Sequence, residues 1–181
     1  NRMPPGWPFD ITETNRDGPC VEMSVFGAKT VKEGHDFKYG CENNAVGLIG
    51  AWIGAGAPEH KEFSYGGGMA DFDRDVLPLF TKAGTWFPNS QSCGSCHFGN
   101  TENSFHEMNL TSYNGLMRGG DTISKPPGVP LFGESVIGAK DYDWGHSKMK
   151  ARLRNNRMPP GMSFDISESN RDGPLVNPLT D

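Results

Sequence analysis

A long internal repeat sets the first limit on the architecture of this chain of 181 residues. Residues 1–19, NRMPPGWPFDITETNRDGP, align without gaps to residues 156–174, NRMPPGMSFDISESNRDGP, and 15 of the 19 positions are identical. Chance does not explain such identity, so both copies were built for one structural task. Any fold must account for the same segment at both ends of the chain.

The composition favours one or two small, loop-rich domains. Gly (24) and Pro (14) are abundant and hydrophobic residues reach only 35%, so long loops share the chain with a modest core. The formal charge of −5 argues against nucleic-acid binding through bulk positive charge. The longest apolar and Gly run, residues 45–57, has 13 members, whereas a membrane-spanning helix needs about 20. We therefore expect a soluble chain without a membrane span.

Two of the four cysteines belong to residues 93–97, CGSCH, which have the C-x-x-C-H pattern of covalent haem c attachment. Two thiols at this spacing add across the two vinyl groups of one porphyrin, and the adjacent imidazole coordinates the iron as proximal ligand. The motif therefore predicts one haem c, with Cys93 and Cys96 as attachment residues and His97 as an iron ligand.

The alternatives to haem for this cysteine pair are a redox dithiol and a zinc site. A redox dithiol of the thioredoxin kind needs a βαβ context, which the flanking sequence lacks. A zinc site needs a second pair of ligands. Cys20 and Cys41 are available for this, but they are 21 residues apart rather than in a second C-x-x-C. Haem is therefore the favoured reading, with zinc or a redox thiol as the alternatives.

The sequence before the motif resembles that of the class I cytochromes c. Residues 71–80, DFDRDVLPLF, predict a short helix with acidic residues in its first turn and an apolar stripe. In the family, a helix with a V-x-P-x-F stripe leads into the haem motif, and Val76, Pro78 and Phe80 match that stripe. Here residues 84–91 form an insertion between the helix and the motif.

The resemblance implies a mostly α, loop-rich class I cytochrome c-like haem domain, with a second partial copy at the N-terminus. It also implies a Met thioether as distal iron ligand. Met158 lies 61 residues after His97, and the two prolines and the Gly that follow it stiffen its loop. Met3 holds the same place in the first copy and is a candidate ligand to another haem. The alternatives are that Met158 fills the core or that a histidine is the distal ligand, the candidates being His35, His60, His106 and His146.

Three further helices are expected. Residues 45–57 resemble the C-terminal helix of class I cytochromes, which ends in W-I-x-x-G-A. Residues 110–120 have an apolar stripe that ends in Gly. Residues 146–154 place Met149 and Leu153 at i and i+4 among four cations. This basic helix either docks an acidic redox partner or presents a solvated face.

The resemblance also divides the chain. Residues 1–58 look like the back half of a haem domain, 59–70 like a linker, and 71–181 like the front half followed by a Met loop. Three arrangements follow. The chain is a piece of a tandem array, or the helix at 45–57 folds back on residues 71–83 of the same chain, or residues 1–58 are exchanged between copies.

Cys20 and Cys41 bound an insertion without clear periodicity. In an oxidising compartment a disulfide between them would contribute roughly 3 kcal/mol, and two buried free thiols are the alternative. Haem attachment implies export, so we expect the disulfide and a periplasmic or extracellular location. No charged-apolar leader opens the chain, so an export signal is expected to have been removed or to lie outside this segment.

The expected function is electron transfer rather than enzymatic catalysis. The iron would cycle between two oxidation states with both axial ligands bound, exchanging single electrons with a redox protein donor and acceptor. Neighbouring haem domains or further copies of the chain are the other expected partners. The alternatives are a haem subunit of an oxidoreductase acting on an inorganic sulfur or nitrogen compound, or a unit of a multihaem conduit. An enzyme would need an exchangeable distal position, and a Met ligand fills it.

Overall fold

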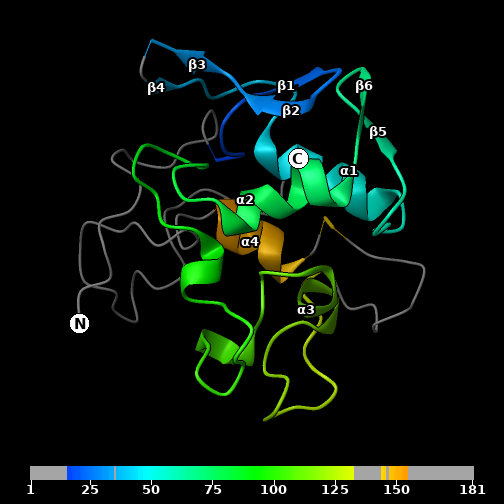
Figure 1. Cartoon of the computed structure of the whole chain (residues 1–181), viewed down its shortest axis with the longest axis vertical. Helices are drawn as coiled ribbons and strands as arrows, with labels where there is room; N and C mark the ends of the chain where they lie inside the picture. The colour runs from blue at the N-terminus through cyan, green and yellow to red at the C-terminus, as the bar shows by residue number, and fades with distance from the viewer. Residues whose placement is uncertain (1–15, 35, 133–143, 146, 155–181) are drawn as a thin grey trace.

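The computed structural model describes residues 16–34, 36–132, 144–145 and 147–154. The elements, in chain order, are strands β1 (Val21–Ser24), β2 (Gly27–Thr30), β3 (Lys32–Glu33) and β4 (Asp36–Phe37), helix α1 (Ala45–Gly54), strands β5 (Phe63–Tyr65) and β6 (Gly68–Ala70), the π-helical segment η1 (Phe72–Val76), helix α2 (Leu77–Thr81), the 3₁₀ turns η2 (Cys93–Ser95) and η3 (Phe105–Glu107), and helices α3 (Tyr113–Arg118) and α4 (Lys148–Arg154). The hairpins gather at one end of the molecule, α1, α2 and α4 cross its middle, and the loops around α3 form the other end (Figure 1).

The expectation of a mostly α, class I cytochrome c-like fold is wrong, because the described residues mix short helices with β-hairpins. They contain three two-stranded antiparallel sheets, β1–β2, β3–β4 and β5–β6. The longest of their helices, α1, has 10 residues. Glycines with positive φ, Gly27 (96°) and Gly66 (55°), lie at the turns of two hairpins, where a residue with a Cβ atom would be strained. None of the described helices has the length and apolar character needed to cross a membrane.

The positions of individual helices were predicted better than the fold class. Each of the four predicted helical segments contains a helix: α1, η1 with α2, α3 and α4. In η1 and α2 the apolar stripe is buried, with Phe72 and Val76 fully inaccessible to solvent. Pro78 lies in the first turn of α2, where the N–H group that proline lacks has no helical partner.

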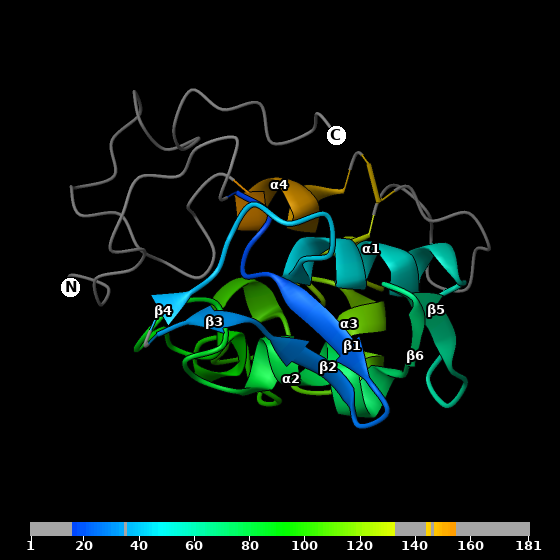
Figure 2. The same cartoon turned by 90° about the horizontal axis from the view of Figure 1, so that it is seen from above.

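Helix α1 forms the centre of the core. The side chain of Asn44 caps it by accepting a hydrogen bond from the N–H of Gly47 at 2.8 Å. The indole of Trp52 packs on Phe72, with 5.0 Å between ring centroids, and on Phe132, at 5.4 Å. Helix α1 lies between α4 and the β1–β2 hairpin (Figure 2). Residues 45–54 therefore pack against the segment that begins at Phe72 of the same chain. This is the contact expected if the helix at 45–57 folds back on residues 71–83.

A buried carboxylate fastens the β1–β2 hairpin to this core. The side chain of Asp75 accepts hydrogen bonds from the N–H of Ala28 in β2 and the N–H of Asp71, at 2.7 and 2.8 Å. Its other partner is the guanidinium of Arg74, at 2.9 Å. The Asp75 side chain is fully buried, so these contacts replace the water that the charge would otherwise require.

The stretch read from the sequence as a linker, residues 59–70, contains the β5–β6 hairpin. Phe63 and Ala70 at the two ends of this hairpin are 4% and 0% exposed and belong to the same apolar cluster as α1. The β5–β6 hairpin therefore packs on the core through Phe63 and Ala70.

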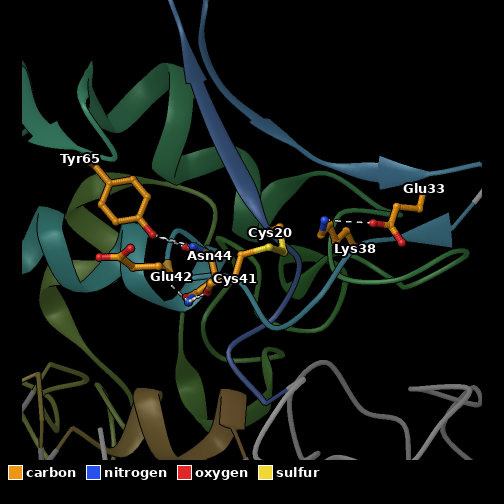
Figure 3. The surroundings of a disulfide bond; sticks show 7 residues. All are labelled: Cys20, Glu33, Lys38, Cys41, Glu42, Asn44 and Tyr65. Atoms are coloured by element: carbon orange, nitrogen blue, oxygen red, sulfur yellow. Dashed lines mark hydrogen bonds and ion pairs between the residues drawn. A yellow bond between two sulfur atoms is a disulfide. The ribbon is translucent and has the colours of Figure 1, made fainter.

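The predicted disulfide between Cys20 and Cys41 is confirmed, with 5.4 Å between the Cα atoms. Cys41 lies three residues before the cap of α1, and its carbonyl accepts a hydrogen bond from the side chain of Asn44 at 2.9 Å. The hydroxyl of Tyr65 accepts from the N–H of Asn44 and donates to its carbonyl oxygen (Figure 3). The disulfide thus ties the start of β1 to the start of α1.

The end of the first repeat copy is part of the core. The carbonyl oxygens of Asp17 and Pro19 accept hydrogen bonds from Val46 and Ala45, at 3.1 and 3.0 Å. Two N–H groups at the start of α1, which lack partners within the helix, are satisfied in this way. The carboxylate of Asp17 also pairs with the buried Arg154 of α4 at 2.6 Å. The Asp-Gly-Pro ending shared by the two copies therefore has a structural role in the first one.

Candidate functional site

Cys93, Cys96 and His97 lie on one tight turn of the chain, η2 and the two residues after it. The N–H groups of Cys96 and His97 both donate to the carbonyl oxygen of Cys93, at 3.2 and 2.9 Å. The hydroxyl of Ser95 donates to the carbonyl oxygen of Ser92 at 2.6 Å. Local hydrogen bonds therefore shape the turn that contains the three residues predicted to attach and ligate a haem.

The turn is seated against the end of α2. The thiol of Cys93 lies 4.0 Å from the carbonyl oxygen of Leu79, which also accepts a hydrogen bond from the indole N–H of Trp86 at 2.8 Å. Trp86 and Phe87 come from the insertion at residues 84–91, and they are 1% and 2% exposed. These two aromatic side chains of the insertion therefore pack inside the molecule, and Trp86 shares the carbonyl of Leu79 with the turn.

His97 has the best-defined environment of the site. Its side chain is buried, and its Nδ1 atom lies 2.9 Å from the carbonyl oxygen of Phe105. Because a carbonyl only accepts, Nδ1 carries the proton and Nε2 has the free lone pair. Burial lowers the pKa of His97 below its usual value, so the ring is neutral at pH 7. A neutral imidazole with a free Nε2 is the form that binds a metal.

The two thiols of the motif are free, in contrast to Cys20 and Cys41. Burial raises the pKa of Cys93 to about 12, and the neighbouring Cys96 acts in the same direction. A redox-active C-x-x-C pair instead needs a thiol of lowered pKa, since the thiolate is the nucleophile. The surroundings of Cys93 therefore do not favour the redox-dithiol alternative.

The zinc alternative loses the ligands that it required. It depended on Cys20 and Cys41 as a second thiol pair, and these two residues are joined to each other. In the part of the chain that the structure describes, His, Cys, Asp and Glu side chains do not gather in threes or more around a potential metal position.

Most of the predicted distal ligands lie outside the described residues: Met3, His35, His146 and Met158. The other two candidates, His60 and His106, are surface residues whose side chains are 78% and 73% exposed. They face Glu59 and Asp121, at 3.7 and 3.6 Å, respectively.

The basic helix was predicted either to dock an acidic partner or to present a solvated face, and both roles require exposed cations. In α4, Lys150 and Arg154 are 6% and 2% exposed, and Met149 and Leu153 are buried beside them. Arg152 is exposed. Two cations of the run therefore face the interior, where Arg154 pairs with Asp17. No local pattern in the sequence indicates this pair, because Asp17 is one of three acidic residues that the two repeat copies share.

Sequence reasoning missed the residues that hold the imidazole. The carbonyl of Phe105 orients the ring, and the carbonyl of His97 accepts a hydrogen bond from the N–H of Leu110 at 2.9 Å. Ser104 adds a hydrogen bond from its hydroxyl to the carbonyl of Cys96 at 3.3 Å. These are mostly backbone contacts, so no residue type marks them in the sequence.

Comparison with models of known protein families gives no match, and comparison with curated proteins gives no significant match.

Proposed function

We propose that this chain is a c-type cytochrome that carries one covalently attached haem and transfers single electrons between redox proteins. Cys93 and Cys96 attach the porphyrin through thioether bonds, His97 is the proximal iron ligand and Met158 the distal one. Haem bound in this way supplies reversible one-electron chemistry at the iron. The observation that carries the proposal is the geometry of the C-x-x-C-H turn, in which both thiols are free and the buried His97 has its Nδ1 atom 2.9 Å from the carbonyl oxygen of Phe105.

The residues of the turn fit the proposed group. Attachment requires two unpaired thiols in a C-x-x-C-H segment, and both thiols are free. Ligation requires an imidazole whose Nδ1 proton has a partner, because that partner fixes the ring orientation and makes Nε2 more basic. The carbonyl of Phe105 has this role. The chain's own contribution is thus to hold the ring, keep it unprotonated and exclude water from it.

The disulfide supports the location that goes with this function. Bonds of this kind persist in oxidising compartments, and the same chain keeps a second pair of cysteines free. We place the protein in the periplasm or outside the cell. There Cys93 and Cys96 do not form a disulfide, because thioether formation consumes their thiols. Its partners are a redox donor and an acceptor. If Met3 ligates a second haem, the domain or chain that carries that haem is a further partner.

Covalent attachment is tested by expressing the chain in a host that matures c-type cytochromes. The wild-type protein should retain its pigment after denaturation and acid-acetone extraction, with one haem per chain. The Cys93→Ala/Cys96→Ala variant should lose all covalent pigment, and His97→Ala should lose attachment or change the spectrum. His60→Ala is the matched control, because that histidine is exposed. A colourless wild-type chain, or one that releases all its pigment, refutes the proposal.

The distal ligand is tested with the two copies of the Met loop. Met158→Ala should abolish the sulfur-to-iron charge-transfer band of the ferric protein, and Met3→Ala should leave it unchanged. The opposite result assigns the ligand to the first copy. If the wild-type protein binds carbon monoxide without loss of fold, its distal position is exchangeable and an enzymatic haem subunit replaces the electron carrier.

A further inference from the structure

The loop that supplies the carbonyl partner of His97 has an unusual backbone. His106 and Glu107 follow Phe105 directly, and both have positive φ angles, 55° and 49°. Residues with a Cβ atom rarely adopt this left-handed conformation, and two in succession are unfavourable without outside support. His106 and Glu107 therefore need contacts with other residues to keep this conformation, and the path of the chain at the Phe105 carbonyl depends on them.

The support comes from the carboxylate of Glu107. One of its oxygens, Oε2, accepts hydrogen bonds from the N–H groups of Ile123 and Ser124, both at 2.7 Å, and from the hydroxyl of Ser124 at 3.1 Å. The backbone carbonyl of Glu107 accepts a fourth bond from the hydroxyl of Thr122 at 2.8 Å. Glu107 thus fastens the strained turn to the segment 122–124, beside the hydrogen bond that the N–H of Asp121 donates to the carbonyl oxygen of His106.

We propose that Glu107 is a positioning residue for the proximal imidazole. It acts through the carbonyl of Phe105, which it holds toward Nδ1 of His97, and so sets the strength of the hydrogen bond that makes Nε2 a better donor. The lowering of the pKa of Glu107 by the N–H groups of Ser124 and Ile123 agrees with a carboxylate that remains charged in this role. This inference rests on the proposed function, because it concerns the ligand that the haem would use.

The test compares Glu107→Ala with Glu107→Gln in the haem-loaded full chain. In Glu107→Ala the Nδ1–H resonance of His97 in the ferrous protein should shift upfield, because its hydrogen bond weakens. The reduction potential should shift upward, because a less basic imidazole stabilises the ferric iron less. Glu107→Gln keeps one acceptor oxygen and should restore part of both shifts. Glu102→Gln is the matched control, an exposed carboxylate five residues earlier.

The outcomes separate this inference from the proposed function. If the wild-type chain carries no covalent haem, the proposed function fails and the role of Glu107 with it. If haem is attached and both Glu107 variants keep the wild-type potential and Nδ1–H resonance, Glu107 is only structural and the inference alone is overturned. A lower melting temperature without these shifts has the same meaning. Should Glu107→Ala not fold, Glu107→Gln decides, since an unshifted resonance and potential in that variant also overturn the inference.

Discussion

The N-terminal core (residues 16–81) and the motif region (residues 82–132) are built in different ways. Among the described residues, sixteen buried apolar side chains belong to the N-terminal core and five to the motif region. The first contains all three hairpins, the disulfide and the ten-residue helix α1. The second has two single 3₁₀ turns and a six-residue helix, α3. The N-terminal core therefore supplies most of the buried apolar surface that stabilises the chain.

The backbone shows the same contrast. The motif region contains four non-Gly residues of positive φ, Asn89, His106, Glu107 and Asp121, whereas the described part of the N-terminal core has one, Ala57. Such strain persists where surrounding contacts enforce it, and it often accompanies functional sites. We infer from this difference that the motif region depends on the N-terminal core for stability. On the proposed function, the porphyrin adds the apolar surface that this region lacks.

The largest effect should come from removing the buried carboxylate of the N-terminal core. Asp75→Ala leaves the N–H groups of Ala28 and Asp71 without their acceptor, and we expect the free energy of unfolding to fall by about 3–5 kcal/mol. The matched control is Asp73→Ala, at an exposed carboxylate of the same π-helical segment, which should change it by about 0.5 kcal/mol or less. Urea denaturation measures both, and equal losses would contradict the importance of the buried contacts.

Removal of the disulfide should come next. Cys20→Ser/Cys41→Ser opens a loop with a sequence separation of 21 residues, and the loss expected from the chain entropy of the unfolded state is about 3 kcal/mol. Denaturant titration of the oxidised wild type and the double variant gives the difference. On the proposed function, the haem content per folded chain should stay the same, because the backbone hydrogen bonds of the turn at residues 93–97 are made within it and with Ser92, Phe105 and Leu110. Reduced haem content in the folded variant would show that the disulfide also helps to position the turn.

The sequence predicted those parts of the fold whose signals are local and periodic. The stripe that contains Phe72 and Val76 correctly indicated a buried helix. The disulfide between Cys20 and Cys41 was also predicted correctly, but from the oxidising compartment that haem attachment implies and not from a local pattern. The hairpins were missed because their strands have two to four residues, too few for an alternating pattern to be recognised. The mostly α fold class was implied by the resemblance to class I cytochromes c, and it was wrong.

For the candidate site, the sequence revealed the side chains but not their supports. The C-x-x-C-H motif is contiguous, so its three residues could be found without knowledge of the fold. The carbonyl of Phe105 could not, because every residue has a carbonyl and only the path of the loop selects this one. Likewise, His106 and Glu107 have positive φ angles without a Gly to mark the turn. Their conformation results from contacts with residues 121–124, which no local pattern encodes.

Two tyrosine hydroxyls connect the two regions and offer a finer test of their coupling. Tyr39 of the N-terminal core donates to the carbonyl of Trp86 at 2.9 Å, and Tyr113 of the motif region donates to the carbonyl of Ala57 at 2.8 Å. Tyr39→Phe and Tyr113→Phe should each lower the free energy of unfolding by about 1 kcal/mol. Hydrogen exchange should quicken in the motif region, while the amide of Leu48 in α1 keeps its protection. Faster exchange confined to α1 would reverse the proposed dependence of one region on the other.

The smallest effect, and the most local, concerns acid. The N–H groups of Ser124 and then Ile123 lower the pKa of Glu107 below its usual value of 4.5, while the charge of Asp121 opposes them. A carboxyl whose pKa is lower in the folded state stabilises the fold above its unfolded pKa, and this contribution is lost as the pH falls through the folded value. As the pH falls below the usual carboxyl pKa of 4.5, the amides of Ile123 and Ser124 should therefore lose protection relative to their intrinsic exchange rates. Glu107→Gln should remove this pH dependence and Glu102→Gln should retain it. An unchanged profile in Glu107→Gln would mean that other carboxylates, not this one, hold the motif region together in acid.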